Sequence, residues 1–199
     1  MLASSEQVRP GGGSLIALGA NLPADGRDPA ATVRHAAEEV GRRLGRAGSA
    51  WTLSRLFRTP AFPPGAGPDY VNAVMDLDSE LDPEDMLKGL HRIEAEADRR
   101  RESRWASRTL DLDLLDVGGT IRPDPATFRH WLDLDAREQG VRAPGELILP
   151  HPRLQDRGFV LVPLVDVAPD WRHPVLDRTA AELLAALPPA ALEGIRPLG

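Results

Sequence analysis

The sequence predicts an α+β fold, a ferredoxin-like β-α-β-β-α-β sandwich with an antiparallel sheet and C-terminal additions. Segments 28–44 and 82–97 begin with an aspartate followed by a proline and repeat apolar residues at helical spacing. Segments 70–78 and 110–115 alternate apolar and polar residues, as half-buried strands do. Further strands are expected at 14–20 and 51–58. This order of strands and helices predicts helices packed on one antiparallel sheet.

The bulk composition is that of a soluble globular protein, with 42% hydrophobic and 27% charged residues among 199. No apolar run approaches the length of a membrane span and no signal pattern is present, so we expect a cytoplasmic protein without a membrane partner. The net charge of −6 argues against a nucleic-acid partner, because such proteins present a broad basic face. The chain has no cysteine, which excludes thiol catalysis and cysteine zinc sites. We expect a monomer.

The first part of the chain is expected to contain a tail, a strand and a helix. Residues 1–13 are polar and end in glycines, which indicates a disordered tail before a single domain at 14–199. Segment Ser14–Ala20 is apolar and short, which favours a buried strand over a helix. The helix begins at Asp28-Pro29, a capping residue followed by proline, and runs to Leu44.

A second strand is expected at Trp51–Arg58 and a third at Tyr70–Asp78, on either side of a proline-rich loop. Residues 60–69 hold four prolines and two glycines, and loops on a rigid scaffold often carry binding residues. In the third strand Tyr70 and Asn72 share one face, because successive side chains of a strand point to opposite faces.

A cluster of arginines follows the second helix, which is expected from Asp82 onward. Its members are Arg99, Arg100, Arg101, Arg104 and Arg108. The helix dipole favours one or two cations at a helix C-terminus, but not five. The cluster is therefore more than a helix cap.

Two aspartates, Asp111 and Asp113, come directly after the arginines and alternate with leucines. On a strand their carboxylates share one face roughly 7 Å apart while the leucines face a core. Magnesium prefers one or two carboxylates together with phosphate oxygens, and the arginine fork matches phosphate oxygens. The stretch therefore favours a site for a polyphosphate carrying magnesium. The alternative is a charged loop before a half-exposed strand, with two like charges crowded on one face.

The C-terminal part is less regular. A short helix is expected within 128–138, and Leu147–Arg153 is extended and enters a turn. Segment Phe159–Val165 is apolar and β-prone, although Pro163 limits it to a sheet edge or a bend. Thr179 and Glu182 fit a capping box at the start of a last helix.

Six stretches together resemble the family of 6-hydroxymethyl-7,8-dihydropterin pyrophosphokinases. They are IALGANL (16–22), FRTPAF (57–62), DYVNAV (69–74), RIE (92–94), RW with RTLDLDLL (104–115) and PHPRLQDRGFVLVPL (150–164). The resemblance implies an ATP-dependent transfer of diphosphate to the hydroxymethyl group of the pterin, with release of AMP, in folate biosynthesis. It also implies that residues 125–145 are a family-variable insertion.

The resemblance implies the following roles for single residues. The catalytic residues would be Arg99, Arg108, Asp111 and Asp113, and two Mg²⁺ ions would bind Asp111 and Asp113. ATP, the co-substrate, would contact Glu94, Arg101, Arg104, Trp105, Arg108, Leu114, His151 and Arg157. Tyr70 and Phe159 would stack on the two faces of the pterin, Asn72 would bind its polar edge, and Thr59, Pro60 and Phe62 would complete the pocket.

Some positions depart from the family pattern. The segment before Trp105 is one residue short, so either Arg99 or Arg100 is the loop arginine. Ala106-Ser107 replaces a usual Gly-Pro pair. Two other functions remain as alternatives: a two-metal nucleotidyltransferase on a ferredoxin-like palm, and a non-catalytic nucleotide-binding module. The first would need a basic track for a polymer, and the net charge of −6 argues against one.

Overall fold

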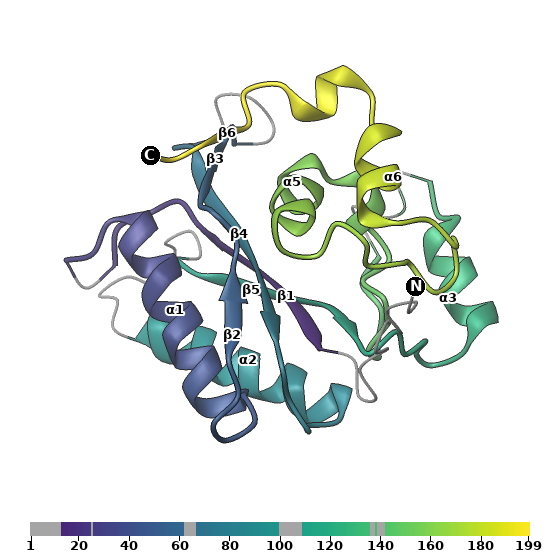
Figure 1. Cartoon of the computed structure of the whole chain (residues 1–199), viewed down its shortest axis with the longest axis horizontal. Helices are drawn as coiled ribbons and strands as arrows, with labels where there is room; N and C mark the ends of the chain where they lie inside the picture. The colour runs from purple at the N-terminus through teal and green to yellow at the C-terminus, as the bar shows by residue number, and fades with distance from the viewer. Residues whose placement is uncertain (1–12, 25, 62–66, 100–108, 136–137, 139–141) are drawn as a thin grey trace, which may run out of the picture.

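The computed structural model describes residues 13–24, 26–61, 67–99, 109–135, 138 and 142–199, with residues 98 and 99 described by their backbone alone. One sheet forms the middle layer of the molecule. Helices α1 and α2 cover one of its faces, and α5 and α6 lie on the other side (Figure 1). No helix in these ranges is long and apolar enough to cross a bilayer.

The strands of the described residues form one antiparallel sheet in the order β5-β1-β4-β3-β6, with β2 also paired to β4. Their bounds are β1 (Ser14–Ala20), β2 (Trp51–Leu53), β3 (Phe57–Thr59), β4 (Tyr70–Leu77), β5 (Asp111–Val117) and β6 (Arg196–Pro197). Helix α1 follows β1 and helix α2 follows β4. The predicted ferredoxin-like order and the antiparallel sheet are confirmed.

Both predicted helices on the first face begin where their capping residues indicate. In α1 (Pro29–Leu44) the carboxylate of Asp28 accepts a hydrogen bond of 2.7 Å from the backbone N–H of Ala31. In α2 (Pro83–Arg99) Asp82 accepts one of 2.9 Å from the N–H of Asp85. Their apolar stripes pack against the sheet in one core cluster, which includes Val33, Ala37, Val40, Met86, Leu90 and Ile93.

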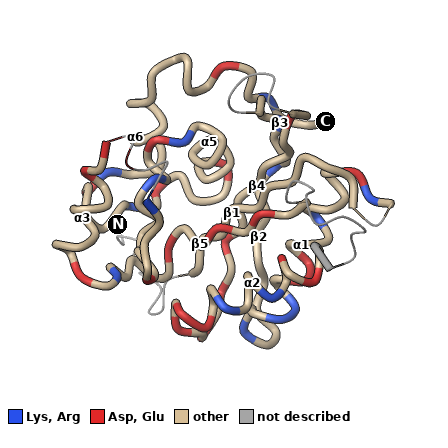
Figure 2. Tube along the Cα trace, turned by 180° about the vertical axis from the view of Figure 1, so that it is seen from behind, with Lys and Arg blue, Asp and Glu red and all other residues tan. Residues whose placement is uncertain are grey.

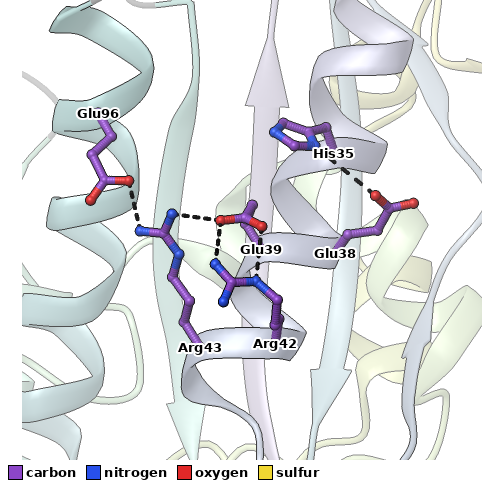
Figure 3. A network of polar contacts seen from close by, with 6 residues as sticks. All are labelled: His35, Glu38, Glu39, Arg42, Arg43 and Glu96. Carbon is purple, nitrogen blue, oxygen red and sulfur yellow. Dashed lines mark hydrogen bonds and ion pairs between the residues drawn. The ribbon is translucent and has the colours of Figure 1, made fainter.

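An ion-pair network joins the outer sides of α1 and α2, where residues of both signs are interspersed (Figures 2 and 3). Arg43 contacts Glu39 of its own helix at 2.6 Å and Glu96 of α2 at 2.7 Å. The hydrogen bond from Arg42, together with Arg43, lowers the pKa of Glu39 to about 2. The carboxylate is therefore ionised throughout the physiological range. Because the pairs are partly solvent-exposed, each contributes little stability on its own.

The segment predicted to be a strand at Phe159–Val165 is part of a helix, α5 (Gly158–Val167). This helix packs on β4 with one side and on α6 (Ala180–Ala185) with another. The run Phe159–Val165 contains no polar residue, so it lacks the one-sided 3.6-residue pattern of an amphipathic helix and resembles a buried strand. The capping box of α6, between Thr179 and Glu182, is confirmed.

The predicted strand Trp51–Arg58 is two strands, β2 and β3. Between them the chain departs from the ladder at Ser54, whose backbone N–H donates to the carbonyl of Val74 at 2.9 Å. The hydroxyl of Ser54 in turn accepts from the N–H of Val74 at 3.0 Å. A side chain thus replaces a backbone acceptor at this point, which interrupts regular pairing without leaving a buried N–H unsatisfied.

The helix expected within 128–138 begins earlier and is shorter: α3 spans Pro125–Leu132. Asp124 caps it by accepting hydrogen bonds from two backbone N–H groups, and Pro125 follows at the first helical position. Phe128 is fully buried and contacts the ring of His173, with 5.6 Å between centroids. The first part of segment 125–145 is thus packed against the C-terminal region. Residues 1–12 of the expected tail lie outside the described residues.

Candidate active site

Strand β5 presents Asp111 and Asp113 on the sheet face that α5 covers. Leu112 and Leu114 are buried in the core on the opposite face, under α1 and α2, as is Leu110 just before the strand. The predicted division of this segment into a leucine face and an aspartate face is confirmed. Both aspartates are only partly buried, and their Cα atoms are separated by roughly 7 Å, the repeat of two residues along a strand.

Arg157, the residue that precedes α5, links the aspartate pair to an aromatic side chain. Its guanidinium lies 3.8 Å from a carboxylate oxygen of Asp113 and 5.6 Å from the centroid of the Phe159 ring. Burial lowers the pKa of Arg157, and the nearby Asp113 opposes that shift. An arginine keeps its proton in such a setting, so the group is a fixed cation beside the carboxylates.

His151 stands next to the same group of charges. Its backbone N–H donates to the carbonyl of Leu115 at 2.8 Å, and its Nδ1 accepts from the N–H of Arg153 at 3.2 Å. Burial, followed by the charge of Arg157, lowers the pKa of His151 to about 3, and Asp111 acts in the opposite direction. The imidazole is therefore neutral at pH 7. Because Nδ1 accepts a hydrogen bond, its proton is on Nε2, which makes it a neutral donor.

The strand register brings the predicted pterin residue Asn72 into one row with Asp111. Gly19 of β1 is opposite Asn72 of β4 on one side and opposite Asp111 of β5 on the other. With neighbouring strands about 4.8 Å apart, the backbones of Asp111 and Asn72 are roughly 10 Å apart. A Cβ on Gly19 would lie 2.8 Å from Oδ1 of Asn72. The glycine therefore gives the amide oxygen of Asn72 room to lie over β1, in the row that leads to Asp111.

The side chain of Asn72 is held in one orientation. Its Nδ2 donates a 2.7 Å hydrogen bond to the hydroxyl of Thr59 on β3, in a buried environment. Tyr70 is opposite Thr59 in the same strand pair and is partly buried. On the other side of the site Phe159 is 39% exposed, which is unusual for a large aromatic side chain. Three of the predicted pterin residues thus lie together on β3 and β4.

Two predicted ATP residues have packing or bridging roles in the structure. Glu94 of α2 accepts a 2.8 Å hydrogen bond from the backbone N–H of Leu112. This bond ties α2 to the edge of the sheet at β5, where that N–H has no strand partner. Leu114 is 4% exposed and belongs to the core. Its side chain is therefore a packing group beneath the site.

Part of the predicted site lies outside the described residues. Arg101, Arg104, Trp105, Arg108 and Phe62 belong to that part, and Arg99 is described as the last residue of α2 by its backbone alone. Segment 100–108 joins the end of α2 to the aspartate strand. Pro60 is exposed at the end of β3.

The donor set fits magnesium bound together with phosphate. Within the described ranges no group of three or more His, Cys, Asp or Glu side chains is arranged to hold a metal ion. Asp111 and Asp113 supply two carboxylates, which is the number that Mg²⁺ commonly takes from a protein when phosphate oxygens and waters complete its octahedron.

Sequence reasoning missed Gly19 as a determinant of the site. It lies within the motif at 16–22, but its importance follows from its neighbours on β4 and β5. A glycine inside an apolar strand is a signal of a close approach, and it is the sign that could have identified this position.

Comparisons with known proteins give one consistent result. A family model described as 7,8-dihydro-6-hydroxymethylpterin-pyrophosphokinase matches residues 15–169. A Synechocystis sp. protein named 2-amino-4-hydroxy-6-hydroxymethyldihydropteridine pyrophosphokinase is 31% identical over 185 residues, covering 93% of this chain and 81% of that protein. A Pseudomonas aeruginosa protein of the same name is 40% identical over 146 residues, covering 73% of this chain and 75% of that one.

The fold is also found among solved structures. The crystal structure of wild-type Plasmodium falciparum HPPK-DHPS superposes with a TM-score of 0.58 at 15% identity, covering 88% of this chain. A triple mutant of the same protein with SDX-DHP gives a TM-score of 0.59 and covers 90% of this chain. The chain spans less than half of those proteins, 44% and 45%. At this level of identity the likeness shows the fold.

Proposed function

The chain belongs to the 7,8-dihydro-6-hydroxymethylpterin-pyrophosphokinase family, and from this premise we propose the reaction that it catalyses. The diphosphate of ATP is transferred as a unit to the hydroxymethyl oxygen of 6-hydroxymethyl-7,8-dihydropterin, in folate biosynthesis. The bond formed joins that oxygen to the β-phosphorus, and the bonds broken are the O–H bond, whose proton is released to solvent, and the bond from the β-phosphorus to the oxygen that remains on AMP. The products are AMP, the pterin diphosphate and a proton.

The observation that carries the proposal is the row formed by Asp111, Gly19 and Asn72. It places a carboxylate pair suited to Mg²⁺-bound phosphates on one edge of the sheet face. It places an oriented amide about two strand spacings away. A diphosphate bound at one end and a heterocycle bound at the other would bring the reacting oxygen and phosphorus together over the glycine, which is catalysis by positioning.

On the phosphate side, Asp111 and Asp113 would hold two Mg²⁺ ions. When bound, these ions would neutralise the negative charge of the phosphates. The guanidinium of Arg157 stays positively charged. It compensates the negative charge of Asp113 and can also donate to a phosphate oxygen. His151, neutral at pH 7, can donate a hydrogen bond to an anionic oxygen. Segment 99–108 would add further guanidinium groups from Arg99 or Arg100, Arg101, Arg104 and Arg108, with Trp105 beside the nucleotide.

On the pterin side, Asn72 would bind the polar edge of the ring. One N–H of its amide is engaged by Thr59, so the amide keeps its orientation and offers its other N–H and its oxygen. Tyr70 and the exposed ring of Phe159 would stack on the two faces of the heterocycle. Pro60 and Phe62 would complete the wall that begins at Thr59.

A chromatographic product analysis tests the proposal. The protein is incubated with ATP, Mg²⁺ and 6-hydroxymethyl-7,8-dihydropterin, and nucleotides and pterins are separated over time. We expect AMP and pterin diphosphate to appear in equal amounts, and no turnover with Mg²⁺ chelated. Formation of ADP would show an ordinary kinase, release of inorganic diphosphate would favour a nucleotidyltransferase, and unchanged ATP would favour a binding module. We also propose that the protein is a monomer, and size-exclusion chromatography tests this by its apparent mass.

A further inference from the structure

Residues 187–199, named the C-terminal strap here, return from the end of α6 to the β3 edge of the sheet (Figure 1). The strap contains a short 3-10 helix, η2 (Pro189–Leu192), and then β6, which pairs with β3. The match to the family model ends at residue 169. The strap therefore lies beyond the part of the chain that defines the family.

The strap packs against the first turn of α5. A Cβ on Gly158 would collide with the carbonyl oxygen of Ala191 and would lie 3.2 Å from Cδ1 of Ile195. Only a residue without a side chain allows two backbones to approach so closely. Gly158 stands between Arg157 and Phe159, so the strap is in direct contact with the turn that presents both of these side chains.

A second contact joins the strap to the end of β3. Gly194 has a φ of +75°, a conformation that side chains other than glycine rarely adopt. A Cβ on Gly194 would lie 2.6 Å from Cγ of Pro60. Pro60 directly follows Thr59, the residue whose hydroxyl orients the amide of Asn72.

The end of the strap is anchored by backbone and core contacts. Residues Phe57 and Pro197 are opposite each other in the β3–β6 pair. The N–H of Leu198 donates to the carbonyl of Leu56 at 2.8 Å, and its side chain packs against the core beneath the sheet. One continuous segment thus touches both walls of the candidate pterin pocket and is fixed to the sheet at its far end.

We propose that the C-terminal strap sets the width of the pterin pocket, and that Gly194 is a positioning residue for it. This inference rests on the proposed function. The strap holds Pro60 on the β3 wall and the Phe159 turn on the α5 wall, so a shift of the strap changes the separation between the two. The aspartate pair lies on β5, at the opposite end of the strand order from β6. The strap therefore acts mainly on pterin affinity, and it reaches the phosphate side only through its contact with Gly158, the neighbour of Arg157.

Calorimetric titration of Gly194→Ala tests the inference. The pterin is titrated in the presence of Mg²⁺ and a non-hydrolysable ATP analogue, and the analogue with Mg²⁺ is titrated separately. We expect the Kd for the pterin to rise by about tenfold or more and the Kd for the analogue to change by less than about twofold. The matched control is Gly48→Ala, because Gly48 has a φ of +77° and nothing within 4 Å of its Cβ position. This control introduces the same strain of a positive φ at alanine but no new contact between side chains.

A second variant weakens the contact with the α5 turn without any backbone strain. In Ile195→Ala the Cδ1 atom that lies 3.2 Å from the Cβ position of Gly158 is lost. We expect a smaller rise in the Kd for the pterin than in Gly194→Ala, and a still smaller rise in the Kd for the analogue, because the same turn also carries Arg157. If Gly194→Ala does not fold, Ile195→Ala decides the question by the same comparison.

The outcomes separate this inference from the proposed function. If Gly194→Ala lowers the pterin affinity no more than Gly48→Ala does, the role of the strap is overturned. The wild-type titration still supports the proposed function in that case. Equal losses for pterin and analogue also overturn it, because they describe a general loss of structure. A wild-type protein that does not bind the pterin at all overturns the proposed function and this inference with it.

Discussion

Substitution of Gly19 by alanine should impair use of the pterin, because the new methyl group would collide with the amide of Asn72. The new Cβ would lie 2.8 Å from Oδ1 of Asn72, so that oxygen must move by about 0.6 Å to reach an ordinary contact of 3.4 Å. The amide cannot turn freely, since its Nδ2 is bonded to Thr59 at 2.7 Å in a buried environment. Losing that bond, or moving both partners, costs about 1–3 kcal/mol.

This cost corresponds to a loss of about fivefold to about 150-fold in kcat/KM for the pterin. Steady-state kinetics with each substrate varied in turn measures it, and thermal unfolding shows that the fold persists. Gly145→Ala is the control, because nothing lies within 4 Å of that position. A Gly19→Ala enzyme with wild-type kcat/KM for the pterin would refute the role of the row that joins the two ends of the site.

Three further predictions concern the site, its pH dependence and the packing of α3. Asp111→Asn and Asp113→Asn should each lower turnover by about a thousandfold or more with little change in melting temperature; near-normal rates would contradict the phosphate assignment. His173 is fully buried, and burial lowers its pKa from 6.5 to about 4. At pH 5 its imidazole is therefore neutral in the folded protein and protonated in the unfolded chain. Stability should therefore fall as pH drops from about 6.5 toward 4, and thermal melts of His173→Asn should show a weaker pH dependence in that window; an unchanged pH profile would count against the linkage. Phe128→Ala should cost about 3–5 kcal/mol in denaturant unfolding, because the ring is 0% exposed; a loss under about 1 kcal/mol would show that α3 packs loosely.

Signals carried by a few neighbouring residues predicted their elements well. Asp28-Pro29 and Asp82-Pro83 mark the starts of α1 and α2, and the alternation before Leu114 marks β5. These elements depend on caps and on one-sided burial, both of which are determined locally.

Elements that depend on their surroundings were predicted incorrectly. The run Phe159–Val165 has no polar residue, and α5 packs on both the sheet and α6, so the sequence alone does not distinguish this helix from a buried strand. The break between β2 and β3 depends on a hydrogen bond between Ser54 and Val74, residues that are far apart in the chain.

The candidate site likewise has features that neighbouring residues predict and features that depend on the tertiary structure. The sequence by itself determined the pair Asp111 and Asp113 on one strand face, and the family motifs predicted Asn72 and Phe159 as pterin residues. Only the tertiary structure decided that Gly19 separates the amide from the carboxylates, and that the strap touches both walls of the pocket. These relations depend on strand order and register, which bring together segments distant in sequence and are set by the packing of the whole core.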